Sequence, residues 1–227
     1  LSGWAWAAGA NSGLPTLTML PPPAIGGGGG GGGGTSAQTS GGDTPVSYTA
    51  SGGTASLTLP ESKVVELIEK SKGGAAVLDL SAAKGVTAAE LPKAALASIA
   101  NAGLDLTLKL PAATVTLDEA AAASVAAQAA GEKVSVSIAP VAASSLTAAQ
   151  QEAVNSGDLV LDIGIRSGGK PISSFDGGTL TVRAPYTGPL PPAVWYLNDA
   201  GELEKLNCAY ENGVVTFVLD HLSLYVV

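Results

Sequence analysis

Apolar and polar positions alternate along most of the chain, with periods that predict both strands and helices. Between residues 54 and 140 a strand-helix-strand unit occurs three times, with a spacing of about 27 residues. The predicted helices cover residues 61–71, 87–102 and 118–129, and the predicted strands cover residues 57–59, 76–80, 104–110, 114–117 and 134–138. Such units are typical of segments that pack against one shared sheet.

Capping residues mark the ends of these predicted helices. Asp118 is placed as an N-cap, and Thr87 with Glu90 three residues later predicts a capping box. Glycines follow the expected helix ends at positions 73, 103 and 131. The pattern therefore predicts short helices with defined ends.

A further short helix is predicted over residues 147–155, and the rest of the chain predicts antiparallel strands. These strands cover residues 159–166, 170–175, 179–184, 193–197, 214–219 and 222–227. Glycine-containing turns separate them at residues 168–169, 176–178, 199–201 and 212–213. We expect these turns to form hairpins.

The N-terminal arm has a different pattern. Side chains of an extended segment alternate between its two sides, so Trp4 shares a side with Trp6, and Leu17 with Met19. This pattern predicts a strand without a local partner. Three prolines at 21–23, nine glycines at 26–34 and a Ser/Thr/Gly-rich stretch then predict a linker.

These patterns predict an α+β protein that is mainly β, with repeated strand-helix units followed by an antiparallel β region. We divide it into an extended, donor-strand-like arm (1–20), a linker (21–53), a repeat region (54–140) and a β-rich region (141–227). The last two regions are also compatible with one domain, 54–227.

Charged residues are distributed unevenly along the chain, and their distribution excludes some classes of binding partner. Residues 1–42 contain no Asp, Glu, Lys or Arg, whereas the whole chain has a formal net charge of -8 with 11 basic residues that are scattered singly. Nucleic acid is therefore not an expected partner, because phosphates require clustered Lys or Arg. The longest apolar stretch is broken by prolines and is too short for a membrane span.

The sequence predicts no catalytic, cofactor or metal site. Asp220 and His221 are adjacent, but no Gly-x-Ser-x-Gly elbow accompanies them. One histidine and the single Cys208 cannot complete a zinc site, and one cysteine forms no disulfide within the chain. The polyglycine run lacks the following helix and Lys of a phosphate-binding loop. We therefore expect a protein that is not an enzyme.

Several motifs in the last three quarters of the chain are similar to those of one family. They are residues 145–151 (SLTAAQQ), 175–182 (FDGGTLTV), 185–187 (PYT), 194–197 (VWYL) and 217–226 (FVLDHLSLYV). In these motifs residues 57–227 resemble a domain of Gram-positive (Firmicute) cell-surface proteins that lies next to surface-layer homology modules. Residues 2–6 (SGWAW) also resemble a motif of bacterial surface repeats. The resemblance implies an extracellular or cell-surface protein with a scaffolding role.

The arm is the candidate functional site. Its large apolar residues would remain exposed without a partner surface, and the polyglycine allows that surface to belong to another molecule. The predicted assembly residues are Trp4, Trp6, Leu14, Leu17, Met19 and Leu20. We hypothesise a subunit of an extracellular filament or surface layer that self-assembles by adding its arm to the sheet of a neighbouring copy. The alternative is an arm that folds back on its own domain and has no role in assembly.

A second hypothesis comes from a different class of protein. In a cell-wall polysaccharide-binding module, Trp195, Tyr196 and Tyr186 would stack on sugar rings. Quenching of tryptophan fluorescence by wall glycans would favour this reading over assembly.

Overall fold

The computed structural model describes residues 4–8, 15–19, 35–38, 44–71 and 74–227, and for residues 4–8, 15–19 and 35–36 it describes the course of the backbone. The chain divides into two compact units, residues 1–32 and residues 33–227. Each unit is described by itself.

The first unit contains a two-stranded antiparallel hairpin. Strand β1 (Trp4–Ala8) pairs with β2 (Pro15–Met19). The prediction of a strand without a local partner is therefore wrong. Between the two strands the sequence contains Gly9, Asn11 and Gly13, residue types that favour chain reversal and are the local sequence signal for this pairing.

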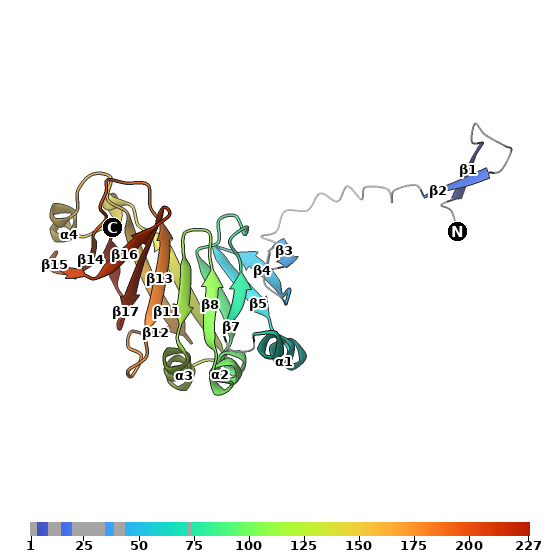
Figure 1. Cartoon of the computed structure of the whole chain (residues 1–227), viewed down its shortest axis with the longest axis horizontal. Helices are drawn as coiled ribbons and strands as arrows, with labels where there is room; N and C mark the ends of the chain where they lie inside the picture. The colour runs from blue at the N-terminus through green and yellow to red at the C-terminus, as the bar shows by residue number, and fades with distance from the viewer. Residues whose placement is uncertain (1–3, 9–14, 20–34, 39–43, 72–73) are drawn as a thin grey trace. The chain divides into compact units, whose positions relative to one another are not determined.

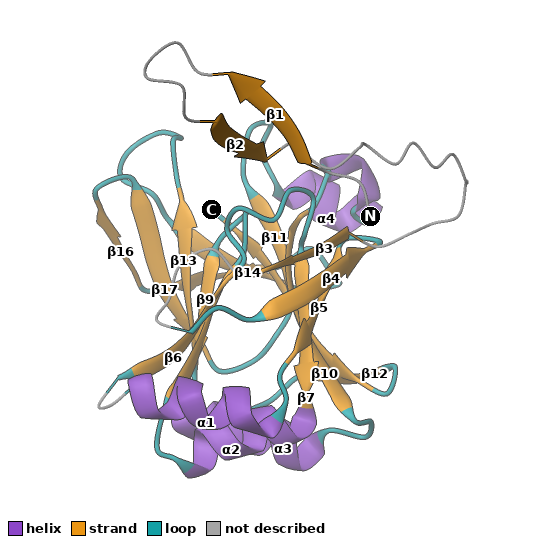
Figure 2. Cartoon of the chain, turned by 90° about the vertical axis from the view of Figure 1, so that its right-hand side faces the viewer, coloured by secondary structure: helices purple, strands orange, loops and turns teal. Residues whose placement is uncertain are grey.

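The second unit is a sandwich of two sheets that face each other, as Figure 2 shows. The larger sheet has ten strands in the order β15-β14-β18-β11-β10-β7-β5-β4-β3, with β12 paired to β11. Its strands are β3 (Thr35–Gln38), β4 (Ser47–Ser51), β5 (Thr54–Thr58), β7 (Ala88–Pro92), β10 (Lys133–Pro140), β11 (Val160–Ser167), β12 (Lys170–Ile172), β14 (Val194–Leu197), β15 (Leu203–Leu206) and β18 (Leu224–Val226).

The smaller sheet has six strands in the order β16-β17-β13-β9-β8-β6. These strands are β6 (Ala75–Asp79), β8 (Asp105–Lys109), β9 (Thr114–Leu117), β13 (Leu180–Pro185), β16 (Cys208–Glu211) and β17 (Val214–Leu219). Most neighbours are antiparallel, but β5 and β7 are parallel, as are β6 and β8.

Three helices lie together at one end of the sandwich (Figures 1 and 2). They are α1 (Glu61–Lys70), α2 (Lys93–Asn101) and α3 (Glu119–Gln128). A short 3-10 turn, η1 (Ala143–Ser145), and the helix α4 (Ala148–Ala153) lie elsewhere. Helix α4 begins at the capping box of Thr147 and Gln150.

The repeat units join the two sheets rather than lying against one. In the first unit β5 belongs to the large sheet and β6 to the small sheet; the second unit, β7-α2-β8, repeats this crossing. The third unit runs the other way, from β9 to β10, because β8 and β9 pair with each other inside the small sheet. The prediction of a shared sheet is therefore wrong, and each helix bridges the end of the sandwich instead.

Some predicted elements have the wrong type. Residues 88–92 form strand β7 in the middle of the large sheet, so the predicted capping box of Thr87 and Glu90 is wrong and α2 begins after Pro92. A short run of apolar residues fits both a helix and a buried strand. Pairing with neighbouring strands determines that residues 88–92 form a strand. Strands β3 and β4 lie within the predicted linker, and β15 and β16 were not predicted. Residues 176–178 connect the two sheets instead of forming a hairpin.

The core lies between the sheets. Strands alternate buried and more exposed residues, as in β8, where Leu106 and Leu108 are fully buried. Tyr225, Phe217 and Phe175 are the largest fully buried side chains, and the remaining core is mostly Ala, Val, Leu and Ile. The structure thus confirms an α+β fold that is mainly β. Among the described helices, none has the length and apolar character to cross a membrane.

Candidate functional site

The N-terminal hairpin brings together four of the six predicted assembly residues. Its register pairs Trp4 with Met19 and Trp6 with Leu17. Directly paired positions lie on the same face of a hairpin, as do positions two residues apart on one strand. The four positions therefore share one face. The other two predicted residues, Leu14 and Leu20, lie outside the described residues.

A hairpin of this kind needs another surface. A two-stranded hairpin is marginally stable in water by itself, and three or more strands or a packing partner are required. This hairpin also has no charged residue to keep it soluble. The register thus gives the predicted assembly site a definite form: a paired ribbon rather than a single strand.

Five described strands of the second unit have a single neighbour: β3, β6, β12, β15 and β16. Of these, β6 is the least protected. Exposed charges mark β15, with Glu204 and Lys205, and β16, with Glu211, whereas β3 has the short polar sequence TSAQ. Charged edge strands resist strand addition. Strand β6 has the sequence AAVLD, and its one charged residue is occupied by an ion pair. Among the described strands, β6 pairs only with β8.

The backbone of β6 presents alternate residues to its open edge. The N–H of Leu80 donates to the carbonyl of Lys109 at 2.7 Å, on the β8 side. In a parallel ladder, residues two apart direct their backbone groups to the same neighbour. Leu78 therefore pairs toward β8, and Val77 directs its N–H and C=O to the open edge. An apolar stretch without Lys or Pro is the sequence signal that marks such an edge.

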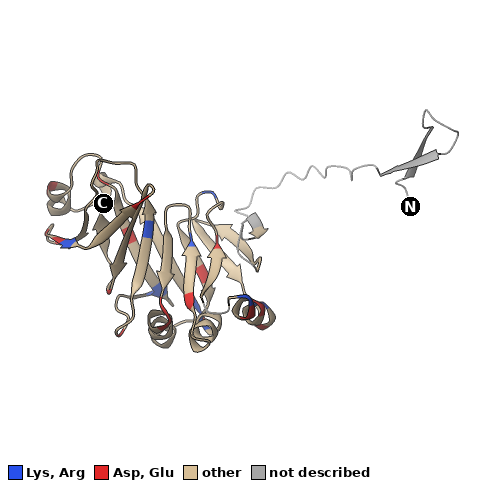
Figure 3. Ribbon diagram, viewed as in Figure 1, with Lys and Arg blue, Asp and Glu red and all other residues tan. Residues whose placement is uncertain are grey.

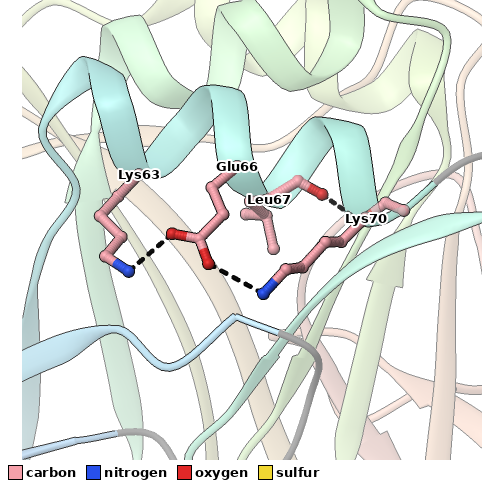
Figure 4. A network of polar contacts seen from close by, with 5 residues as sticks. Lys63, Glu66, Leu67 and Lys70 are labelled. Carbon is pink, nitrogen blue, oxygen red and sulfur yellow. Dashed lines mark hydrogen bonds and ion pairs between the residues drawn. The ribbon is translucent and has the colours of Figure 1, made fainter.

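The charged residues of the helical end gather on α1 (Figure 3). Glu66 accepts hydrogen bonds from Lys63 at 2.7 Å and from Lys70 at 2.8 Å, as Figure 4 shows. These two bonds lower the pKa of Glu66 from 4.5 to about 2. Helix α1 immediately precedes β6, so a charged surface flanks the start of the apolar edge.

The aromatic residues of the polysaccharide hypothesis do not form one platform. Trp195 packs with the second apolar cluster, which includes Leu146 and Val226, whereas Tyr196 packs against the main core. Adjacent residues of a strand point to opposite faces, so both cannot stack on one sugar chain. Tyr186 lies after β13 and makes an edge contact with Tyr210 at 6.4 Å between ring centroids. The Lys205 ammonium lies 5.6 Å from the Trp195 ring.

His221 has a structural environment. Its Nδ1 lies 2.7 Å from the Asp220 carboxylate, and its ring packs edge-on against Tyr196 at 4.7 Å. This hydrogen bond lowers the pKa of Asp220. Within the described ranges, no hydroxyl or thiol hydrogen-bonds to the imidazole, and no group of three or more His, Cys, Asp or Glu is arranged to hold a metal ion.

Comparisons with known proteins add no family assignment: no family model, no curated protein and no solved structure matches the chain. The resemblance to cell-surface domains therefore contributes an expectation, and the function is argued from the geometry above.

Proposed function

We propose that the protein is a structural subunit of an extracellular filament or surface layer, in which the N-terminal hairpin of one copy docks on a neighbouring copy. The observation that carries this proposal is the hairpin register, which gathers Trp4, Trp6, Leu17 and Met19 on one face of an uncharged ribbon. Such a face gains free energy by leaving water, and the isolated hairpin is only marginally stable. The resemblance to surface-layer-associated domains supports the extracellular location.

The acceptor that fits best is the open edge of β6. A hairpin has two outer edges, and either can continue a sheet by backbone hydrogen bonds. Addition beside β6 extends the six-stranded sheet and leaves the charged edges β15 and β16 untouched. Because the donor and the acceptor are different surfaces of the chain, the contact is heterologous and propagates into a filament unless it closes into a ring.

The polyglycine run supports docking on a neighbour. Residues 20–34, between β2 and β3, have the composition of a linker, and flexible chains of this length span roughly 20 Å on average and roughly 50 Å at full extension. Either span allows the hairpin to reach an adjacent copy.

Complementary defects test the proposal. A chain that lacks residues 1–20 loses the donor. Val77→Pro removes an N–H from the open edge of β6 while the ladder to β8 remains, and proline is tolerated at such edge positions. Each variant alone is expected to stay monomeric in sedimentation velocity and to form no fibres in negative-stain images. Mixed together, they should form a one-to-one complex and stop there.

Val77→Thr is the matched control, because it keeps the backbone donor and should assemble like the natural chain. Assembly of the truncated chain at the natural concentration would rule out the hairpin as connector. Normal assembly of Val77→Pro with loss of assembly in the truncated chain would keep the donor and reject β6 as acceptor.

A further inference from the structure

The outer face of the six-stranded sheet contains an open recess of about 580 Å³. It lies over strands β8, β9 and β13 and the loops beside them. Two basic residues line it, Lys109 and Arg183. The other lining residues are hydroxyl-bearing, such as Thr107, Thr114 and Thr116, or apolar, such as Pro111 and Pro185.

The register places the two cations on either side of a threonine. Lys109 of β8 pairs with Thr114 of β9, and Thr114 pairs with Arg183 of β13. Neighbouring strands are about 4.8 Å apart, so the two basic residues lie roughly 10 Å apart across Thr114. Both side chains are long enough to converge on one small group above the threonine.

Arg183 is free to bind a ligand. Within the part of the chain that the structure describes, its guanidinium has no hydrogen-bond or ion-pair partner. It is exposed on a strand whose other outward residues are Thr181 and Pro185. An unpaired guanidinium presents a fork of donors that matches a carboxylate with two parallel hydrogen bonds.

Lys109 is only loosely engaged. Its Nζ lies 3.3 Å from the Asp79 carboxylate, longer than usual for a charge-assisted hydrogen bond, and its side chain is 43% exposed. Asp79 also accepts hydrogen bonds from the backbone N–H and the hydroxyl of Ser81. Burial alone would raise the pKa of Asp79, but the hydrogen bonds from Ser81 and Lys109 lower it. Asp79 therefore stays ionised and hydrogen-bonded to these two residues. The three charged groups leave the recess with a net positive charge on a chain whose total is -8.

The threonines supply hydrogen-bonding hydroxyls in register. Thr107 and Thr116 are 2.9 Å apart between their Oγ1 atoms, and Thr114 lies two residues from Thr116 on the same face of β9. Hydroxyl donors and acceptors of this kind match the hydroxyls of a sugar, and Pro111 and Pro185 provide apolar contact at the rim.

We infer that this recess binds an acidic glycan, with a sugar carboxylate held between Arg183 and Lys109 and neighbouring sugar hydroxyls on the threonines. None of the residues that line the recess is Trp195, Tyr196 or Tyr186, and none belongs to β1 or β2. The recess gives the subunit a means of attachment to a negatively charged polysaccharide.

The test is calorimetric titration of the full chain with three tetramers: tetragalacturonate, neutral maltotetraose and tetraglutamate. Tetragalacturonate is expected to bind, and the other two to bind at least about tenfold more weakly. Binding should weaken as sodium chloride is raised, because an ion pair at an exposed site is screened. Absence of tetragalacturonate binding, or equal binding of maltotetraose, overturns the inference; equal binding of tetraglutamate assigns the recess to acidic peptides instead.

Substitutions locate the site. Arg183→Gln should weaken tetragalacturonate binding at least about tenfold, and Arg183→Lys should restore it only in part, because lysine lacks the planar fork. The matched control is Arg166→Gln, which removes the same charge from an exposed position of β11 in the other sheet. Equal losses in the two variants would show a general charge effect and reject the recess. Circular dichroism melting confirms that each variant is folded.

Discussion

Asp118 binds Thr179 through both hydrogen-bond donors of the threonine. The Asp118 carboxylate accepts from the Thr179 backbone N–H at 2.8 Å and from its hydroxyl at 2.7 Å, while its other oxygen accepts from the Ala121 N–H at 2.7 Å. One side chain thus caps α3 and holds Thr179, which lies 61 residues further along the chain and directly precedes β13. Helix capping is a local role that sequence predicts; the bond to Thr179 exists only in the folded sheet.

Asp118→Ala should therefore cost more than an ordinary cap. Loss of an N-cap costs about 1 kcal/mol, and loss of hydrogen bonds to a charged group adds about 1.5 to 3 kcal/mol. We expect the free energy of unfolding to fall by about 2 to 4 kcal/mol in urea denaturation. The control is Asp199→Ala in the exposed turn before β15, which should change it by less than about 0.5 kcal/mol. Equal effects of the two substitutions would mean that the bonds to Thr179 contribute nothing.

Gly178→Ala adds a single methyl group, but it should lower the free energy of unfolding substantially. A Cβ at this position would clash with the backbone nitrogen of Ala121, in the first turn of α3. Backbone cannot yield as a flexible side chain does, so α3 and β13 must separate. We expect a loss of about 3 kcal/mol or more, measured as a lower urea midpoint.

Gly74→Ala is the matched substitution, because its nearest neighbour would be the Ser71 carbonyl oxygen at 4.0 Å and its backbone is not in the left-handed region. A Gly178→Ala protein as stable as the natural chain would contradict the close contact between Gly178 and α3.

Glu90 makes stability depend on pH. Hydrogen bonds from Lys133 at 2.8 Å and from Ser56 at 2.6 Å lower the pKa of Glu90 below its usual 4.5. A carboxylate with a lowered pKa in the folded state contributes stability above pH 4.5, and the contribution is lost as the pH falls through the folded value. Glu90→Gln should thus destabilise the protein at pH 7, and the gap to the natural chain should narrow between pH 5 and pH 2.

Denaturation curves at pH 7, 5, 4 and 2.5 measure this gap, and Glu204→Gln controls for the loss of one negative charge on an exposed strand. A gap that stays constant over this range would show that the bonds to Lys133 and Ser56 do not stabilise the ionised form.

Gln150 ties α4 to the end of β14. It is buried, donates to the Asn198 carbonyl at 3.1 Å and accepts from the Thr147 N–H at 3.1 Å. Gln150→Glu replaces the donor by a carboxylate oxygen facing a carbonyl oxygen. An unsatisfied buried group of this kind costs about 1 to 3 kcal/mol. The measurement is the urea midpoint at pH 7; the neighbouring Gln151→Glu, at a position exposed to water, should have the smaller effect, and the reverse order would contradict the role of Gln150.

The two tryptophans of the arm illustrate what can and cannot be predicted from the sequence. Their spacing predicts that Trp4 and Trp6 share a face, but not that β1 pairs with β2, because a pairing partner is not encoded in the period of one strand. Similarly, the recess at Arg183 was not predicted. Lys109 and Arg183 are far apart in sequence and ordinary in composition, and only the order β8-β9-β13 brings them together.

The sequence by itself determined the local elements that have strong local signals: α3 with its Asp118 cap, the short helix α4, and strands such as β8 and β17 with alternating burial. Only the tertiary structure decided that residues 88–92 form a strand, that each repeat unit crosses between sheets, and that β6 has a single neighbour among the described strands. The reason is physical. Capping and periodicity depend on residues a few positions apart, whereas strand pairing is chosen among many distant partners by the core that each arrangement buries.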